Sequence, residues 1–166
     1  MIYDKFKKKK LPHIIINVLS YLILAGGLAR FIMAYGSLDY RIGVHFSMHG
    51  FFDVYYDKWL GFYPFVLSFL VCIFCGVFDR IIQKVRISQN TTIHGDELIR
   101  KCMRIFLDLF QFIMVGFYSG YWSHCVITEQ PMPTWVRPFV LVVIIVLIAA
   151  TATFLIGVYR ICRNKW

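Results

Sequence analysis

The run PHIIINVLSYLILAGGLARFIMAY, residues 12–35, decides the class of this protein. Arg30 is the single Lys, Arg, Asp or Glu residue within it. An α-helix needs about 20 mainly apolar residues to cross the hydrocarbon core of a bilayer, which is roughly 30 Å thick. Residues 12–35 are therefore predicted to form a helix that crosses a membrane.

Three further apolar runs have a similar character, and they cover residues 60–78, 103–125 and 136–159. Of the 166 residues, 59% are apolar and only 16% are charged. In lipid, the polar groups of the backbone must find partners inside the protein, and a helix supplies them within its own segment. The sequence therefore predicts an all-α membrane protein, a bundle of four transmembrane helices. No cleavable signal peptide is expected, because the first apolar run is long and no small-residue cleavage site follows it.

Basic residues alternate between the segments that join these runs. Most of the lysines and arginines fall in residues 1–11, 79–102 and 160–166, whereas the connectors 36–59 and 126–135 hold few. Segments rich in Lys and Arg stay in the cytoplasm. We expect a plasma-membrane protein with both termini cytoplasmic and residues 36–59, the outer connector, outside. The formal net charge of +9 is then explained by topology and by anionic membrane lipid, without nucleic acid as a partner.

The outer connector is long for a link between helices, and its apolar content argues against disorder. Residues 41–47 alternate, with Ile42, Val44 and Phe46 on one side, which is typical of a strand. Gly50 supplies a turn, since glycine tolerates positive φ. We expect a short extended element that folds back over the helix ends as an extracytoplasmic cap.

Candidate metal ligands recur at every fourth position of the outer connector. They are His45, His49, Asp53 and Asp57. On a helix they form one stripe, and such His and Asp sets bind zinc or another divalent metal. Gly43 and Gly50 count against a continuous helix, and the alternative is a hydrogen-bonded structural cluster. His124 and Glu129, near the second outer connector, are candidates to complete a metal site.

The outer connector also carries the pattern H-F-x-x-x-G-x-x-D between the first two predicted helices. The matching residues are Asp39, Arg41, Ile42, Val44, His45, Phe46, Gly50 and Asp53. This stretch resembles a family of small bacterial membrane proteins with a domain of unknown function. The domain is also found ahead of the immunity domain in the protein that protects against a sporulation-delaying peptide toxin. Gly43 replaces the family's proline and Ser47 its asparagine, which implies a looser backbone before His45 and a less firmly held turn.

The resemblance covers about residues 19–70 and implies a role in immunity or signalling. In toxin-immunity relatives, that role is to sequester or sense a secreted antimicrobial peptide at the outer face. Arg41, His45, Phe46, Gly50 and Asp53 are then a ligand-binding or structural cluster, and no catalytic residue is assigned.

Two other functions stay open. The first is an accessory or scaffold subunit of a membrane transport complex, or a homo-oligomer. The second is a metal-dependent membrane enzyme that uses His45, His49 and Asp53, with His124 as a further ligand. The chain has no nucleophile motif of the G-x-S-x-G type, so we favour a non-catalytic protein.

Two charged residues fall within the predicted spans. Arg30 is expected to pair with Asp39 or Asp53 of the outer connector, or to extend to the membrane interface. Asp108 is expected to pair with Arg104 one turn earlier, or to serve as a proton or ion relay group.

Small residues mark faces on which helices can approach closely. Gly26 and Gly27 in the first span form one such pair, and Gly116 and Gly120 in the third form another.

Overall fold

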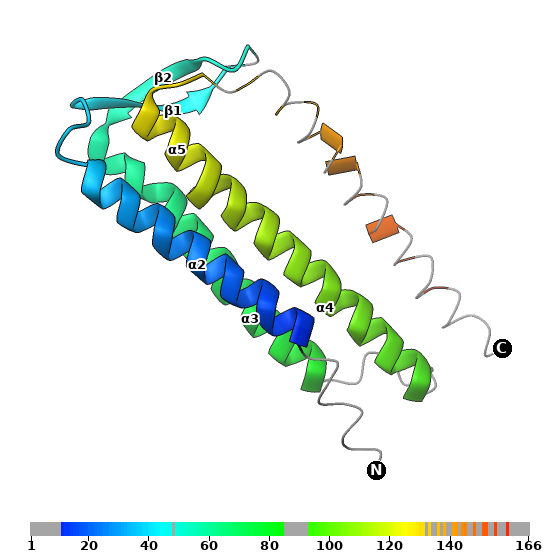
Figure 1. The fold of residues 1–166 in the computed structure, drawn as a ribbon. Helices are drawn as coiled ribbons and strands as arrows, with labels where there is room; N and C mark the ends of the chain where they lie inside the picture. The colour runs from blue at the N-terminus through cyan, green and yellow to red at the C-terminus, as the bar shows by residue number, and fades with distance from the viewer. Residues whose placement is uncertain are drawn as a thin grey trace.

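The computed structural model describes residues 11–47, 49–84, 93–131 and scattered positions between 133 and 159. The elements are α2 (Leu11–Ala34), β1 (Arg41–Phe46), β2 (Phe52–Asp57), η2 (Lys58–Phe62), α3 (Tyr63–Lys84), α4 (Ile93–Val115), η3 (Gly116–Trp122) and α5 (Ser123–Thr128). Three long helical rods run side by side, and a β-hairpin covers one end of them (Figure 1). The protein is mostly helical, and the hairpin is an addition to the all-α architecture expected from the sequence.

Three helices are long and apolar enough to cross a membrane, judged by length and composition: Pro12–Ala34, Lys58–Lys84 and Gly95–Thr128. They confirm the first three predicted spans. Apolar side chains cover the outside of these helices, as lipid contact requires. Examples are Leu22, Ile32, Val66, Phe69, Leu70 and Ile73.

The fourth predicted span, residues 136–159, lies mostly outside the described residues, and the positions in it that are described are helical. The four-helix bundle therefore stays a prediction, with three of its helices confirmed. The basic segments 1–10 and 160–166 also lie outside the described residues.

The second and third helices extend further than the apolar runs indicate. The connector predicted over residues 79–102 is shorter, because α3 continues to Lys84 and α4 begins at Ile93. Two ion pairs form in this region, with Arg104 Nε 2.9 Å from Asp79 Oδ1 and Arg100 Nε 3.0 Å from Asp96 Oδ2. Hydropathy marks the lipid-facing part of a helix, whereas backbone hydrogen bonding continues into the polar part.

A π-helical segment, η3, interrupts the third rod where it meets α2. A Cβ atom added to Gly27 would lie 2.0 Å from the main-chain oxygen of Ser119, so the two backbones are in close contact. Ser119 also donates a hydrogen bond of 2.8 Å to Ser68 Oγ on α3. The close helix contact expected for glycines therefore exists at Gly27, whereas Gly26 and Gly116 face open space.

The main apolar core lies at the hairpin end of the bundle. Phe31 is fully buried, and its ring centroid lies 5.0 Å from that of Phe62 and 5.5 Å from that of Phe65. Burying one such side chain stabilises the fold by about 1.5–3 kcal/mol. Ile42 and Val44 of β1 belong to the same core. The hairpin is therefore packed into the bundle rather than tethered beside it.

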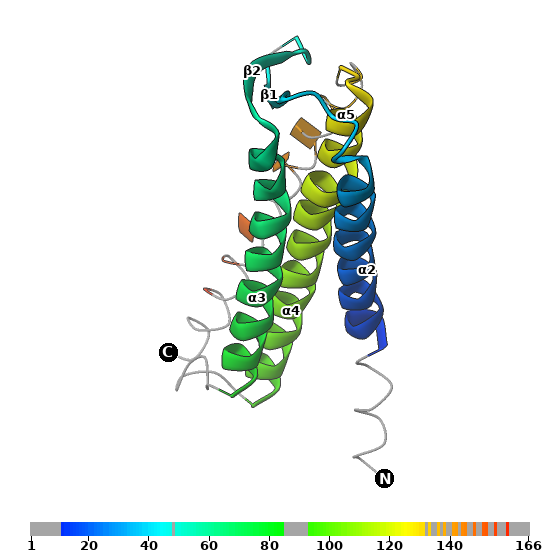
Figure 2. The same cartoon turned by 90° about the vertical axis from the view of Figure 1, so that its left-hand side faces the viewer.

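The hairpin pairs β1 with β2 in antiparallel register, with Ile42 opposite Tyr56 and Phe46 opposite Phe52. The strand predicted for residues 41–47 is confirmed as β1, and the sequence reasoning missed β2. β1 lies toward the helices and β2 lies away from them (Figure 2). The cap expected over the helix ends is therefore a two-stranded sheet.

Candidate functional site

The hairpin is fixed to the bundle through the inner side of β1. Ile42 and Val44 are buried, and Gly61 of η2 allows the close approach of Ile42. A Cβ at Gly61 would lie 2.7 Å from Ile42 Cδ1 and 2.3 Å from Phe31 Cζ. Only glycine leaves room for both side chains at this point. The position of the hairpin is thus set by core packing.

Lys58, the residue after β2, ties the end of the hairpin to α2. Its ammonium group donates a hydrogen bond of 3.3 Å to the main-chain oxygen of Tyr35 and lies over the Tyr35 ring. Its backbone N–H donates to the oxygen of Tyr40 at 2.9 Å. Both ends of the hairpin are therefore held at the same helix end.

Gly43 and Ser47, which depart from the family pattern, both have a structural role. A Cβ at Gly43 would lie 2.1 Å from Cγ of Phe52, so the Phe52 ring packs directly on the glycine backbone. Ser47 Oγ accepts a hydrogen bond from the backbone N–H of His49, and Ser47 O accepts one from Gly50. Gly50 has φ of 81°, as the predicted turn requires. The strand pairing is irregular on both sides of His45, and Ser47 supplies the hydrogen bonds at the turn where the resemblance expects an asparagine.

His45 and Asp53 meet across the two strands. Nδ1 of His45 lies 2.7 Å from Oδ1 of Asp53, and both side chains are largely exposed. Such a cross-strand pair stabilises a hairpin modestly. The hydrogen-bonded pair matches the structural reading of this cluster.

The stripe that His45, His49, Asp53 and Asp57 would form on a helix is absent, because the segment forms two strands and a turn. Gly50 contributes to this, because its φ of 81° lies outside the helical region. Within residues 11–47, 49–84 and 93–131, no group of three or more His, Cys, Asp and Glu side chains is placed to hold a metal ion.

His124 and Glu129 lie at the same end of the bundle as the hairpin but in another element. His124 belongs to α5, and its buried Nδ1 has no hydrogen-bond partner among the described residues. Glu129 is the residue that ends α5, with φ of 52° in the left-handed region. Its backbone role is that of a helix C-cap.

The two arginines singled out from the sequence are both exposed. Arg30 makes no ion pair with a described residue, so the expected pair with Asp39 or Asp53 is not formed. Asp53 instead contacts His45. Arg30 lies near the end of α2, where a long side chain extends readily to the interface. Arg41 begins β1 and stands opposite Asp57 in the register.

β2 presents side chains on both of its faces to the surroundings. Val54, Tyr55 and Tyr56 are all exposed, the tyrosines by 55% and 53%. Neighbouring aromatic residues extend this exposure, and together they define the outer aromatic surface: Tyr40, Phe51, Tyr55, Tyr56 and Trp59. The sheet has two strands in the described part of the chain, so the outer edge of β2 has no strand partner there.

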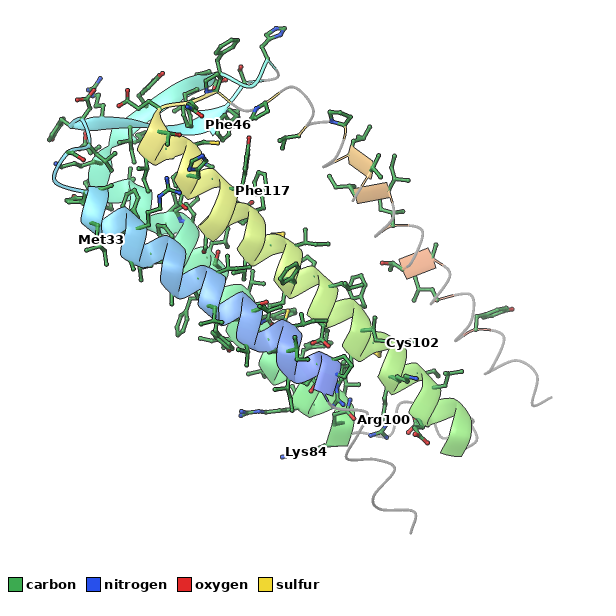
Figure 3. All side chains as sticks on the ribbon, viewed as in Figure 1. Met33, Phe46, Lys84, Arg100, Cys102 and Phe117 are labelled. Atoms are coloured by element: carbon green, nitrogen blue, oxygen red, sulfur yellow. The ribbon has the colours of Figure 1, made fainter. Side chains whose placement is uncertain are left out.

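A second polar group of residues, the far-end cluster, lies at the opposite end of the bundle. Figure 3 shows Lys84 and Arg100 at this end and Phe46 at the hairpin end. The far-end cluster joins three helices: His13 and Asn17 from α2, Asp79 from α3, and Arg104 and Asp108 from α4.

Asp108 bonds to α2 rather than to Arg104. Its Oδ1 lies 2.7 Å from Nδ1 of His13 and accepts a hydrogen bond of 3.3 Å from Asn17 Nδ2. Arg104 contacts both oxygens of Asp79, at 2.9 and 3.2 Å. His13 Nε2 is 3.9 Å from Asp79 Oδ2. The expected pair between Arg104 and Asp108 is therefore wrong, because each residue has a partner on another helix.

A cavity of about 220 Å³ borders the far-end cluster. Gln111 lines it, is 1% exposed, and has an amide nitrogen with no hydrogen-bond partner within the described segments. Sequence reasoning missed His13, Asn17, Asp79 and Gln111. A polar pair at positions i and i+4 in an apolar run, His13 and Asn17, is the signal that indicates a polar helix face.

Compared with known proteins, the chain matches no protein-family model, no curated protein and no solved structure. The resemblance of the outer connector to the bacterial immunity-associated family therefore stays a prediction from the sequence.

Proposed function

We propose that this is an integral plasma-membrane protein that binds a secreted antimicrobial peptide on the outer aromatic surface, in an immunity or signalling role. The observation that carries the proposal is the contrast between the two strands. β1 is fixed in the core by Ile42 and Val44, while β2 exposes Val54, Tyr55 and Tyr56 on a free edge. Because β1 is packed in the core, β2 is held in a fixed position, and its exposed aromatic side chains are available to bind a peptide.

A free strand edge binds an extended peptide by main-chain hydrogen bonds, and flanking side chains provide selectivity. Aromatic side chains contribute large contact areas at a low entropic cost. Residues 39–58 contain three aspartates against one arginine and one lysine, so this region lacks the positive charge of the rest of the chain. These features favour an apolar peptide that carries no net negative charge.

The orientation in this proposal places the hairpin outside and both termini in the cytoplasm. It is supported by the basic residues, which are concentrated in segments at the other end of the helices. Two variants test it, each made with Cys102→Ser to remove an exposed thiol. A membrane-impermeant thiol reagent is expected to label Tyr56→Cys in intact cells and to leave Lys84→Cys unlabelled. The reverse pattern would overturn the orientation.

Peptide binding is tested by survival. Cells with the protein are expected to tolerate a secreted peptide, from a panel made by the same and neighbouring strains, that kills cells without it. Tyr55→Ser combined with Tyr56→Ser is expected to abolish this tolerance. The matched control is Tyr159→Ser, which removes an exposed tyrosine outside the hairpin. Equal survival with and without the protein across the panel contradicts the proposal, and so does full tolerance in the double variant.

A further inference from the structure

A cleft between α2 and α3 borders the far-end cluster. α4 supplies the floor through Asp108 and Gln111, while Tyr21 of α2 and Arg80 of α3 line it and are exposed. A Cβ at Gly76, on the α3 side, would have no atom within 4 Å. α2 and α3 are separated at this end with α4 behind them, as Figure 2 shows. The cleft therefore opens toward the outside of the bundle.

The depth of this cleft matches the boundary between lipid tails and headgroups. Asp108 precedes Thr128, at the hairpin end of its helix, by 20 residues. His13 precedes Ala34 by 21 residues. Each distance corresponds to about 30 Å along a helix, which is the thickness of the hydrocarbon core. With the helix ends beside the hairpin at one boundary, both residues reach the other.

Among the described residues, Asp79 has an arginine partner and Asp108 has neither a lysine nor an arginine partner. Asp79 is neutralised by the two contacts of Arg104. Oδ1 of Asp108 lies 2.7 Å from Nδ1 of His13 and accepts a hydrogen bond from Asn17, and no described residue donates to its Oδ2. A carboxylate in a water-poor site requires a positive partner or additional donors. One such partner is a single cationic group in the cleft.

Gln111 independently indicates a polar ligand in the same place. Its side chain is buried, lines the cleft, and has an amide N–H group without an acceptor in the described part of the chain. A buried donor without an acceptor destabilises the fold. A ligand that carries both a cationic donor and oxygen acceptors satisfies Asp108 and Gln111 together.

We propose that this cleft binds the headgroup of an aminophospholipid, with its primary ammonium group on Asp108. The ammonium group donates to the carboxylate, and oxygen atoms of the headgroup accept from Gln111. The guanidinium of Arg80, exposed at the cleft, is the phosphate partner. A zwitterionic headgroup thus meets a carboxylate on the floor and a cation on the cleft wall. The location at the headgroup boundary favours a lipid as the source of the amine.

The test compares dioctanoyl phosphatidylethanolamine with dioctanoyl phosphatidylcholine. Both carry the same phosphate and net charge, but the choline nitrogen has no N–H group to donate. Purified full-length protein in detergent is titrated with each lipid, and binding is measured by native mass spectrometry and by the rise in unfolding temperature. We expect at least about tenfold tighter binding of the ethanolamine lipid, the ratio given by about 1.4 kcal/mol. Equal binding of the two lipids overturns the proposal without any variant.

Variants then locate the site. Asp108→Asn is expected to reduce the ethanolamine preference to near one, while Asp53→Asn, which alters a hairpin carboxylate, is expected to preserve it. Gln111→Leu keeps the size of the side chain and is expected to weaken ethanolamine-lipid binding several-fold, which covers the case in which Asp108→Asn fails to fold. An ethanolamine preference that is unchanged in folded Asp108→Asn contradicts the site, and so does ethanolamine-lipid binding that is unchanged in Gln111→Leu. Equally tight binding of soluble O-phosphoethanolamine would overturn the lipid as the source.

Discussion

The ammonium nitrogen of Lys58 lies 3.3 Å from the main-chain oxygen of Tyr35 and 4.8 Å from the centroid of the Tyr35 ring. The oxygen belongs to the residue directly after α2, at the C-terminal end of the helix, where carbonyl groups carry a partial negative charge. The residue that leaves the hairpin is therefore bonded to the helix that precedes the hairpin. This contact closes the loop at the base of the cap.

Lys58→Met is expected to loosen the hairpin, because the thioether side chain keeps the length but loses the charge. The lost hydrogen bond and cation–π contact correspond to about 1–2 kcal/mol of local opening free energy. Faster hydrogen exchange at residues 41–57 is the expected readout. Lys84→Met, at the opposite end of the bundle, is the control and is expected to leave exchange in the hairpin unchanged. Unaltered hydrogen exchange in Lys58→Met would contradict a stabilising contact between Lys58 and Tyr35.

Gly43→Ala is expected to displace Phe52, because the added Cβ would lie 2.1 Å from Cγ of that ring. Forcing an atom into a packed site costs about 1–3 kcal/mol. Limited proteolysis of the hairpin measures the effect, and cleavage is expected to be faster than in the unmodified protein. Combining Gly43→Ala with Phe52→Ala is expected to cost less than the sum of the two single changes. Gly36→Ala, which meets nothing within 4 Å, is the control.

Adjacent glycines in α2 provide a matched pair of substitutions. Gly27→Ala is expected to lower the unfolding temperature, because its Cβ would lie 2.0 Å from a main-chain oxygen of η3, which cannot rotate away. Gly26→Ala faces open space and is expected to be neutral or slightly stabilising, since alanine favours a helix by about 1 kcal/mol over glycine. Thermal unfolding in detergent compares them. Equal unfolding temperatures for the two variants would show that the helices are not in contact at Gly27.

Arg104→Gln is expected to destabilise the bundle by roughly 1–3 kcal/mol, because it leaves the half-buried carboxylate of Asp79 without its cation. The pair Asp79→Asn with Arg104→Gln is expected to be more stable than Arg104→Gln alone, since no unpaired charge remains. A double-mutant cycle on unfolding free energy measures the coupling. Additive effects of the two substitutions contradict a direct pair.

Sequence reasoning succeeded where one physical requirement dominated. The lipid core sets the length of an apolar helix, so three spans were found, although α3 and α4 continue into charged residues beyond the predicted ends. β1 was found because Ile42 and Val44 alternate with polar neighbours and face the core. β2 was missed because it is exposed on both faces and therefore lacks an alternating pattern.

The far-end cluster was missed for a different reason. Asp108 and His13 are 95 positions apart in the chain, and only the packing of α2 on α4 brings them together. The nearer candidate, Arg104, lies on the same helix but turns toward Asp79 of α3. A local rule for pairs along one helix thus selected a partner that tertiary packing overrides. The stripe of metal ligands that a helix would form is absent likewise, because Gly50, with φ of 81°, turns the backbone between His49 and Asp53.

The π-helical segment η3 sets the rotational phase between the two halves of the third rod. A π turn contains one residue more than an α turn, and one residue corresponds to about 100° around a helix axis. Removing that residue would rotate α5 and take Val126 out of the core beneath the hairpin, while Asp108 on α4 would keep its orientation toward α2. Because of η3, α5 directs its buried residues toward the hairpin while α4 directs Asp108 toward the polar cleft, within one continuous helical rod.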